Sequence, residues 1–427
     1  MNVYFSSTKK IFSNILNSNI GFKGDFGLLV ISIALSVFGL LMIFSASSTI
    51  AYIRYGDTFY YFNRQLLWLI FGFLVGYFFY RVNLDKIKFL SYFLLFISYG
   101  LMIFMLPEAL SAFNPDGTKV IKMPFVVTLN GATRWYDFGF LSIQPSELFK
   151  LSLILVGSYI LCRTDREKVK LSKFLEQYVN NNSIFNSFLG FIFRNLFFSI
   201  TLFGVLLVFA QRDLDTIIVI LLIYFSMVFV AATSTKQKMH ILKIFLIFVI
   251  FGFFSILLED FRRNRVLGYL EILLYGEPSR EFRDGVSFQF WNGLVALGSG
   301  GLFGVGYGES RQKLFFLQDA AFTDSIFAII GEEFGLLGTI GVILSFLYIL
   351  SKGIEIAKSS SKKLYVLIAT GVTTFVISQA FLNISANLGV IPFAGMALPF
   401  LTYGGSNTIV TLTSIGILIN ISKRSNR

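Results

Sequence analysis

Long apolar runs alternate with short polar segments along almost the whole chain. Windows of about twenty apolar residues, the length a helix needs to cross a bilayer, recur ten times. Strands of a membrane β-barrel would alternate over about ten residues, so the runs predict helices. The pattern predicts an all-α polytopic membrane protein with about ten transmembrane helices, and an even number places both termini on one side. The predicted spans are 26–46, 62–80, 89–106, 146–161, 195–210, 214–232, 241–258, 326–350, 364–383 and 403–421.

Lysine and arginine are unevenly distributed between the loops that these spans define. Most of the 36 Lys and Arg residues fall in the two tails and in alternate loops. Because cytoplasmic loops are enriched in Lys and Arg, both termini are predicted to be cytoplasmic, with a large extracytoplasmic loop at 259–324 between helices 7 and 8. Topology then explains the net charge of +12, and we expect no nucleic-acid partner.

The predicted domain organisation is one membrane domain with two short tails. Residues 1–25 form a cytoplasmic N-terminal tail, 26–423 a single transmembrane domain, and 424–427 a cytoplasmic tail. The first span lacks the short apolar region and small-residue cleavage site of a signal peptide, so we expect it to be retained. Segments long enough for additional structure are the outer loops 107–145 and 259–324 and the cytoplasmic loop 162–194.

The composition limits the chemistry that the protein can perform. The chain has one Cys, Cys162, and one His, His240, with 55% apolar residues. One Cys excludes an internal disulfide and a cysteine-rich metal site, and one His excludes a histidine cluster. Any catalysis must therefore use carboxylates, amides, hydroxyls, Lys or Arg.

Charged residues at membrane depth are costly, so they mark candidate functional positions. Glu147 lies in the first turn of the predicted fourth span, and Lys150 is three residues further on. The two could form an internal ion pair that anchors the helix. Alternatively, Lys150 and Arg134 could face an anionic lipid head group. Arg212, in the short turn before the sixth span, is interpreted as a snorkelling side chain paired with a neighbouring Asp.

A glycine run at 298–308 lies in the long outer loop. Such a run can bring backbone N–H groups close to an anion. It lacks the pattern of a P-loop and the strand–helix context of one, so the signal is weak alone. Arg311 and Lys313 just after it strengthen the case for an anion site.

Asp324 precedes the predicted eighth span, and Glu332 and Glu333 lie inside that span. Helical geometry places Glu332 80° from Asp324 around the axis after two turns, so the two could line one cavity at different depths. Asp324 either caps the helix or acts in catalysis. Among arginines it is expected to stay ionised, which suits a proton acceptor or a metal ligand. Amides at 383–387 and the irregular segment 398–407 are predicted to form a cavity wall.

Together these segments resemble the SEDS family, the FtsW/RodA group of membrane proteins that polymerise peptidoglycan glycan strands. The resemblance covers most of the chain. Within the family, 308–313 and 55–61 look more like the division branch, FtsW, than the elongation branch, RodA. The most specific segments are 130–135, 144–150, 296–306, 310–317, 323–333 and 398–406.

The resemblance implies a ten-helix fold and a glycosyltransferase that polymerises lipid II at the outer face of the bacterial cytoplasmic membrane, releasing undecaprenyl pyrophosphate. Asp324 falls on the family's essential acid, and it is the candidate metal ligand for a divalent cation, Mg²⁺ or Mn²⁺, with no organic cofactor. Implied partners are lipid II, undecaprenyl-linked glycan, a class B penicillin-binding protein (an FtsI-like transpeptidase) and other division proteins at the septum. Candidate substrate or pyrophosphate ligands are Arg134, Glu147, Lys150, Arg262, Arg265, Gln289, Arg311, Lys313, Glu332 and Ser406.

Three positions depart from the family pattern. Phe322 stands where a His usually precedes Thr-Asp, and Gln318 replaces a common Pro. The usual Gln-Pro-Asp-Leu-Gly reads Gln-Arg-Asp-Leu-Asp at 211–215. Asp324 is retained, so an active enzyme is expected. The alternatives are a lipid II flippase, which moves lipid II without polymer, and a non-catalytic division scaffold.

Overall fold

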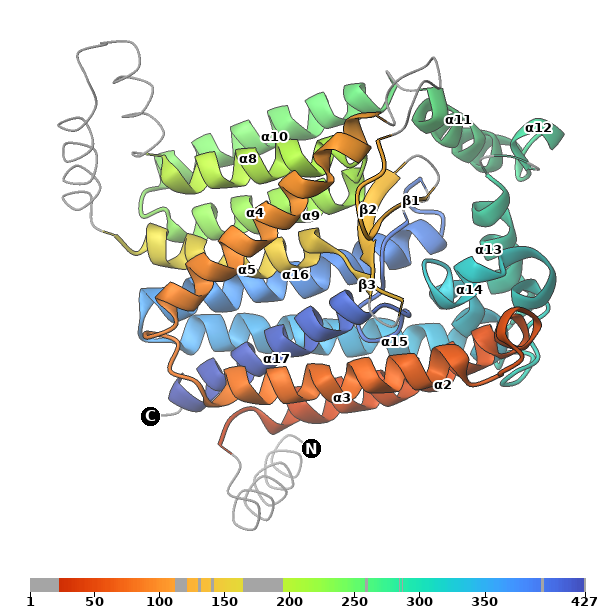
Figure 1. Ribbon diagram of the computed structural model, residues 1–427, viewed down its shortest axis with the longest axis horizontal. Coiled ribbons are helices and arrows are strands. Elements are labelled where there is room, and N and C mark those ends of the chain that lie inside the picture. Colours follow the sequence, from red (N-terminus) through yellow and green to blue (C-terminus); the bar gives the residue numbers. More distant parts are fainter. Residues whose placement is uncertain are drawn as a thin grey trace, which may run out of the picture.

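Long helices lying side by side form most of the molecule, with shorter helices gathered at one end (Figure 1). The computed structural model describes residues 23–425 apart from 112–120, 130–131, 140–141, 164–194, 258–259, 284, 286 and 393–394. The long helices are α2 (Phe26–Tyr55), α3 (Tyr60–Arg81), α4 (Lys88–Ser111), α5 (Pro145–Leu161), α8 (Leu196–Ala210), α9 (Leu214–Ala231), α10 (Thr235–Leu257), α15 (Ile326–Ser359), α16 (Lys363–Asn387) and α17 (Gly405–Ser425).

A helix occupies each of the ten predicted spans. Within the described residues, seven helices are long and apolar enough to cross a membrane by themselves: α2, α3, α4, α9, α15, α16 and α17. The apolar helices α5 and α8 have 17 and 15 residues. The polytopic membrane fold is confirmed, while the total of ten spans and the domain limits stay predictions. Much of the predicted N-terminal tail and of the cytoplasmic loop 162–194 lies outside the described residues.

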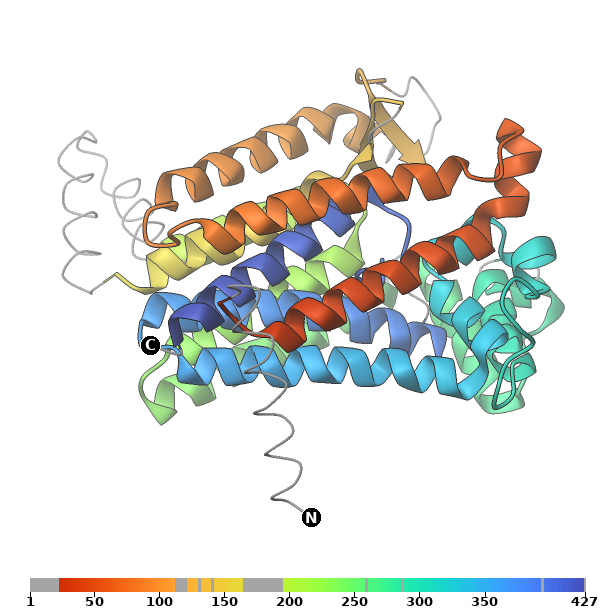
Figure 2. The same ribbon diagram turned by 90° about the horizontal axis from the view of Figure 1, so that it is seen from below.

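The two ends of the described chain meet at the same end of the bundle (Figure 2). The backbone N–H of Asp25 donates to Ser422 Oγ at 2.8 Å. This contact agrees with the predicted even number of crossings.

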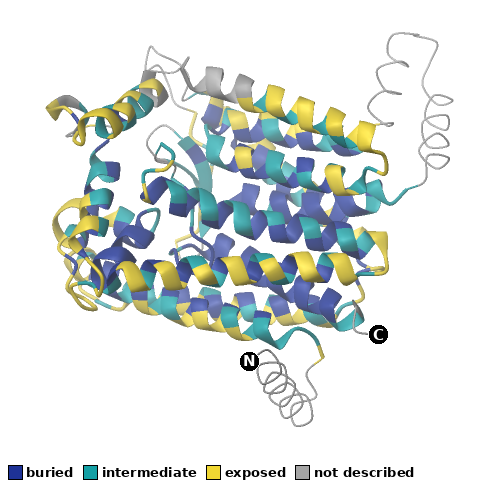
Figure 3. Ribbon diagram, turned by 180° about the vertical axis from the view of Figure 1, so that it is seen from behind, coloured by how far each residue is buried: buried dark blue, intermediate teal, exposed yellow. Residues whose placement is uncertain are grey.

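Residues of the central helices are mostly buried, and the peripheral helices carry many exposed residues (Figure 3). Those of α3 and α4 include Leu67, Leu74 and Phe96, which are 66%, 62% and 76% exposed. In α17, 89% of the membrane-spanning window is buried, against 28% in α3. A helix that is apolar all round yet half exposed needs an apolar solvent, which the bilayer supplies. The peripheral faces of α3 and α4 are therefore lipid-facing surfaces.

A small antiparallel sheet, which the all-α prediction did not include, lies at the C-terminal end of α4. Its strands are β1 (Val126–Leu129), β2 (Ala132–Asp137) and β3 (Ser142–Ile143), in the order β1-β2-β3. The Glu108 carboxylate of α4 accepts hydrogen bonds from the Met123 N–H at 2.9 Å and the Thr128 hydroxyl at 2.8 Å. The Tyr136 hydroxyl donates to the Leu101 carbonyl at 2.7 Å. These bonds fix the strand that carries Arg134.

The outer loop before α15 contains α11 (Asp260–Tyr275), α12 (Arg280–Arg283), α13 (Phe288–Ser299), a π-helical turn η1 (Lys313–Leu317) and α14 (Asp319–Phe322). Residues 300–308, here called the glycine loop, join α13 to the segment before η1. The loop lies beside a break in α15 at Gly335, whose φ of 65° and ψ of −159° are not helical. Its close approach requires glycine, since a Cβ at Gly304 would collide with the Glu333 carbonyl.

Four backbone hydrogen bonds join the glycine loop to the break in α15. They run from Val305 N to Glu332 O at 2.9 Å, Gly306 N to Glu333 O at 3.1 Å, Leu336 N to Gly301 O at 2.9 Å and Leu337 N to Leu302 O at 3.3 Å. At the break, backbone N–H and C=O groups of α15 lose their partners within the helix. The glycine loop supplies hydrogen-bond partners for them. The loop and the two halves of α15 therefore form one unit.

Candidate active site

Asp324 lies in the turn between α14 and α15, and its backbone is firmly held. The Asn383 and Asn387 side-chain amides of α16 donate to the Asp324 carbonyl at 2.9 and 3.0 Å. Asn383 Nδ2 also donates to the Met396 carbonyl at 2.6 Å. Two amides spaced one helical turn apart thus fix the turn and bring the segment that starts at Gly395 beside it.

The residues around Asp324 complete the turn. Gln289 Nε2 of α13 donates to Ser325 Oγ at 3.1 Å, and the Tyr403 N–H donates to the Phe322 carbonyl at 2.9 Å. The Phe322 ring lies between Tyr61 and Tyr403, with centroid distances of 4.6 and 5.8 Å. Phe322 therefore packs in an aromatic cluster, and Gln289 contacts the turn through its neighbour rather than through Asp324 itself.

The Asp324 carboxylate faces the N-terminal end of α9. A Cβ built on Gly395 would lie 3.0 Å from Asp324 Oδ2, and the Gly395 N–H donates to the Asp215 carboxylate. Burial, and then the negative charge of Asp215, raise the pKa of Asp324 to about 6, although Arg134 and Arg265 oppose the rise. At neutral pH a carboxyl group with this pKa is still mostly ionised.

Asp213 caps α9 and ties it to two other elements. Its carboxylate accepts from Thr216 N at 3.3 Å and from Gln144 Nε2 at 3.1 Å. Arg134 Nη1 lies 3.7 Å from Asp213 Oδ1, and Arg134 Nη2 donates to the Arg212 carbonyl at 2.5 Å. Strand β2 therefore positions the Arg134 guanidinium at the N-terminal end of α9, close to Asp324.

Ser406 joins the start of α17 to the segment before α5. Its hydroxyl accepts from the Gln144 N–H at 3.0 Å and donates to the Ser142 carbonyl at 3.3 Å. Since Gln144 contacts Asp213, Ser406 acts on the site through these intermediates.

Glu147 and Lys150 form an ion pair inside the helix bundle. Lys150 Nζ lies 2.7 Å from Glu147 Oε1, and both side chains are almost completely buried. Gln379 Nε2 donates to the same carboxylate oxygen at 3.3 Å, and the ammonium lies 5.2 Å from the centre of the Phe375 ring. The geometry matches the internal ion pair of the two sequence interpretations, and it gives Lys150 no exposed surface for a head group.

Lys313 belongs to a second buried set of charges, the clamp of Ser45, Lys313 and Glu333. Lys313 Nζ contacts Glu333 Oε1 at 2.6 Å, Ser45 Oγ at 2.9 Å and the Gly308 carbonyl at 2.7 Å. Ser45 Oγ lies 2.6 Å from Glu333 Oε1. The clamp binds α2, α15 and the end of the glycine loop together, so the lysine's contacts are internal.

Glu332 also contacts the loop rather than a cavity shared with Asp324. Its carboxylate accepts from Ser310 Oγ at 2.5 Å and from the Arg311 N–H at 2.9 Å. The Arg311 side chain itself is exposed. The N–H groups of Val305 and Gly306 are bonded to carbonyls of α15, so these two groups of the glycine loop are not available to an anion.

The two candidate arginines of α11 are Arg262 and Arg265. Arg265 is half-buried, and its charge acts on both Asp324 and Asp215. The side chain of Arg262 lies outside the described residues. In the described part of the chain no three His, Cys, Asp or Glu side chains are grouped to hold a metal ion.

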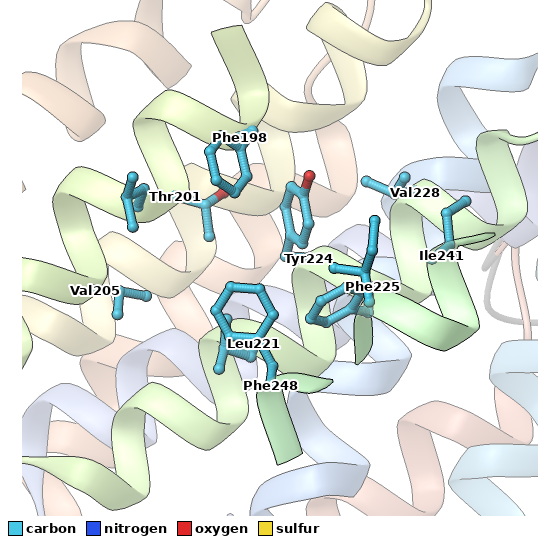
Figure 4. Close-up of a pocket in the computed structure, with 11 residues that line it drawn as sticks. Phe198, Thr201, Val205, Leu221, Tyr224, Phe225, Val228, Ile241 and Phe248 are labelled. Atoms are coloured by element: carbon cyan, nitrogen blue, oxygen red, sulfur yellow. The ribbon is translucent and has the colours of Figure 1, made fainter. Parts of the chain in front are cut away.

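An apolar cavity of about 130 Å³ lies between α8, α9 and α10 (Figure 4). Phe198, Leu221, Phe225 and Phe248 are among the side chains that line it. It contains none of the candidate site residues.

The sequence did not predict that Asp215 lies beside Asp324, or that the two asparagines hold its backbone. Amides in a predicted span were the available signal, because an uncompensated polar group is costly there. Asp215 gave no such signal, since an acid in the first turn of a helix is ordinary.

Comparisons with known proteins agree with this arrangement. Residues 26–427 match the model of the FtsW/RodA/SpoVE family, described as cell cycle protein. The chain is 32% identical over 400 residues to "Probable peptidoglycan glycosyltransferase FtsW" of Geobacter metallireducens, covering 94% of this chain and 95% of the relative. It is also 32% identical over 402 residues to "Stage V sporulation protein E" of Bacillus subtilis, covering 94% and 97%.

Solved structures share the fold at lower identity. A chain described under "Structural coordination of polymerization and crosslinking by a peptidoglycan synthase complex" matches with a TM-score of 0.64 and 22% identity, covering 95% of this chain and 99% of that one. Thermus thermophilus rod shape determining protein RodA matches with a TM-score of 0.57 and 22% identity, covering 95% and 98%. The chain is therefore a multi-pass membrane protein that belongs to the FtsW/RodA/SpoVE family of cell cycle proteins.

Proposed function

We propose that the protein is a peptidoglycan glycosyltransferase that polymerises lipid II at the outer face of the cytoplasmic membrane, for septal synthesis in cell division. The family and the relative named FtsW support this activity. The observation that carries it is the Asp324 carboxylate, which is partly accessible beside Arg134 and Arg265 on a backbone fixed by two amides.

In the proposed reaction, the 4-hydroxyl of an acceptor sugar attacks the anomeric carbon of the lipid-linked donor. The new C–O bond forms as the bond from the anomeric carbon to the pyrophosphate oxygen breaks, and undecaprenyl pyrophosphate leaves with the electron pair. Asp324 accepts the hydroxyl proton. A pKa of about 6 leaves the carboxylate mostly ionised at neutral pH and basic enough for transfer, an effect typically worth about 10²–10⁴ in rate.

The departing pyrophosphate needs positive charge, which the chain supplies with Arg134 and Arg265. The donor set also fits Mg²⁺ or Mn²⁺, because Mg²⁺ is commonly held by one or two carboxylates together with substrate phosphates. Asp213 already accepts bonds from Thr216 and Gln144, so Asp324 and Asp215 are the carboxylates that would hold the ion. When bound, the cation would neutralise charge on the leaving pyrophosphate.

A class B penicillin-binding protein, an FtsI-like transpeptidase, is the proposed partner, with other division proteins at the septum. The support is indirect: a structural relative comes from a peptidoglycan synthase complex whose title joins polymerisation to crosslinking. The relatives named FtsW support the division role over elongation.

The test is a polymerisation assay with labelled lipid II, purified chain and its cognate penicillin-binding protein, with and without chelator. Asp324→Asn should abolish polymer, whereas Asp319→Asn, an exposed acid five residues earlier, should retain it. Normal polymer from Asp324→Asn would exclude Asp324 as the catalytic base. Scrambling of lipid II in liposomes without polymer would favour a flippase, and no activity with normal growth of Asp324 variants would favour a scaffold.

A further inference from the structure

The outer loop contains a long uncharged stretch that the proposed chemistry does not use. No Asp, Glu, Lys or Arg occurs between Asp284 and Glu309. The glycine loop is the exposed part of this stretch, with Leu302 62%, Phe303 76% and Val305 45% exposed. Contiguous exposed apolar side chains mark a surface that is covered by something apolar.

The depth of the glycine loop follows from α2 and α15. Asp25 Oδ2 at the start of α2 pairs with Lys352 Nζ of α15 at 3.2 Å, so these positions are level. At about 1.5 Å per residue, Leu41 lies about 24 Å from Asp25 along α2, and Gly335 about 26 Å from Lys352 along α15. The hydrocarbon core of a bilayer is about 30 Å thick. Both points therefore lie near the outer boundary between acyl chains and head groups.

The glycine loop is attached at this depth. The Tyr307 hydroxyl donates to the Leu41 carbonyl at 2.8 Å, and the Leu337 N–H donates to the Leu302 carbonyl at 3.3 Å. Leu41 and Leu337 are 48% and 60% exposed on membrane-spanning helices. The apolar surface of the loop is thus continuous with the lipid-facing surface of α2 and α15.

Part of the loop backbone has its hydrogen bonds satisfied within the protein, which favours an apolar environment. Irregular backbone is tolerated at membrane depth only where its polar groups are satisfied by the protein. Gly304 N donates to the Gly300 carbonyl at 2.8 Å, and Val305 and Gly306 donate to carbonyls of α15. These three bonds lower the cost of placing this part of the loop among acyl chains.

We propose that the glycine loop inserts Leu302 and Phe303 into the outer leaflet, where lipid acyl chains cover them. The loop then anchors the segment that leads through Lys313 and η1 to the turn of Asp324 at a constant depth. A segment of another protein is the competing occupant of this surface, and the experiment separates the two.

A nitroxide spin label on a single introduced cysteine measures the environment directly. Cys162→Ala removes the only native thiol, and Phe303→Cys carries the label. The full chain is reconstituted alone in phosphatidylethanolamine–phosphatidylglycerol vesicles. Collisions with oxygen, which partitions into hydrocarbon, are compared with collisions with a water-soluble nickel complex. Leu337→Cys on α15 is the lipid-facing control, and Glu309→Cys, exposed in the same segment, is the aqueous control.

The label at position 303 should match position 337, with frequent oxygen collisions and a loss of nickel collisions relative to position 309. A label at 303 that resembles 309 overturns the proposal. Protection that develops only when a penicillin-binding protein is added also overturns it, because the occupant is then a protein. The controls at 337 and 309 must differ from each other, which verifies that the labelled chain is folded and inserted.

Discussion

Two sets of buried charges in the outer half of the protein use similar side chains differently. In the clamp, Lys313 faces Glu333 at 2.6 Å, and Ser45 bonds to both. At Asp324 the backbone is held, but the carboxylate meets a second acid, Asp215, and its pKa is raised. Removing the partner of a charge that is paired inside the protein destabilises the fold, whereas a charge beside a like charge has a shifted pKa and is a candidate for proton transfer.

Lys313→Ala should produce the largest loss of stability, because it leaves the Glu333 carboxylate buried without a cation. Breaking a buried pair in this way typically costs about 3–5 kcal/mol. Thermal unfolding of the purified protein in detergent measures the loss. Replacing both partners, Lys313→Met with Glu333→Leu, should recover most of it. An unchanged midpoint for Lys313→Ala would mean that the clamp does not stabilise the fold.

Asp324→Asn should change stability in the opposite direction while removing activity. Since the folded pKa is raised from 3.8 to about 6, ionisation of Asp324 costs stability as the pH rises through this range. A shift of two units corresponds to at most about 3 kcal/mol. The variant should therefore unfold at a higher temperature than the parent at pH above about 7, and with no gain below the ordinary Asp pKa. Equal gains at both pH values would exclude ionisation as the cause.

Asp215→Asn should alter the pH dependence of polymerisation. Removing the negative charge of Asp215 lowers the pKa of Asp324, so the fall in rate at acid pH moves to lower pH, by about one unit. Because Asp215 would also hold the cation, the maximum rate should fall as well, and each profile is therefore compared after scaling to its own maximum. Rate against pH for the parent and the variant measures the shift. Asp137→Asn, an exposed acid of β2, is the control and should leave the profile unchanged. An unshifted profile in Asp215→Asn would mean that the charge of Asp215 does not influence the pKa of Asp324.

Arg54→Ala should have the smallest effect. Arg54 and Asp319 form a bidentate pair at 2.7 and 2.8 Å, but their side chains are 41% and 54% exposed. Exposed pairs contribute about 0.2–1 kcal/mol and weaken in salt. The same unfolding measurement at low and high salt should show a small loss that salt abolishes. A loss of stability as large as that of Lys313→Ala would mean that this exposed pair matters as much for stability as the buried pair of the clamp.

The helices were predictable because each span carries its own signal of length and apolarity. The break in α15 was not, since a glycine inside an apolar run is compatible with an unbroken helix, and its partner is a loop about thirty residues earlier. The three-stranded sheet was missed because its strands have only two to six residues.

The site was partly predictable. Asp324 stood out as an acid at the start of a span, and Arg134 and Arg265 act on it as the sequence suggested. The sequence could not show whether the side chains of Lys150, Lys313 and Glu332 face the protein interior or a substrate. An acid or a base near a helix end can adopt either orientation with the same sequence. Tertiary contacts decide that question, and here all three turn inward.

The two amides at Asp324 also affect how a sugar can approach. A carbonyl oxygen has two lone pairs, and Asn383 and Asn387 occupy both at this residue. A sugar hydroxyl that approaches Asp324 would therefore find the side-chain carboxylate, and not this carbonyl, as its hydrogen-bond acceptor.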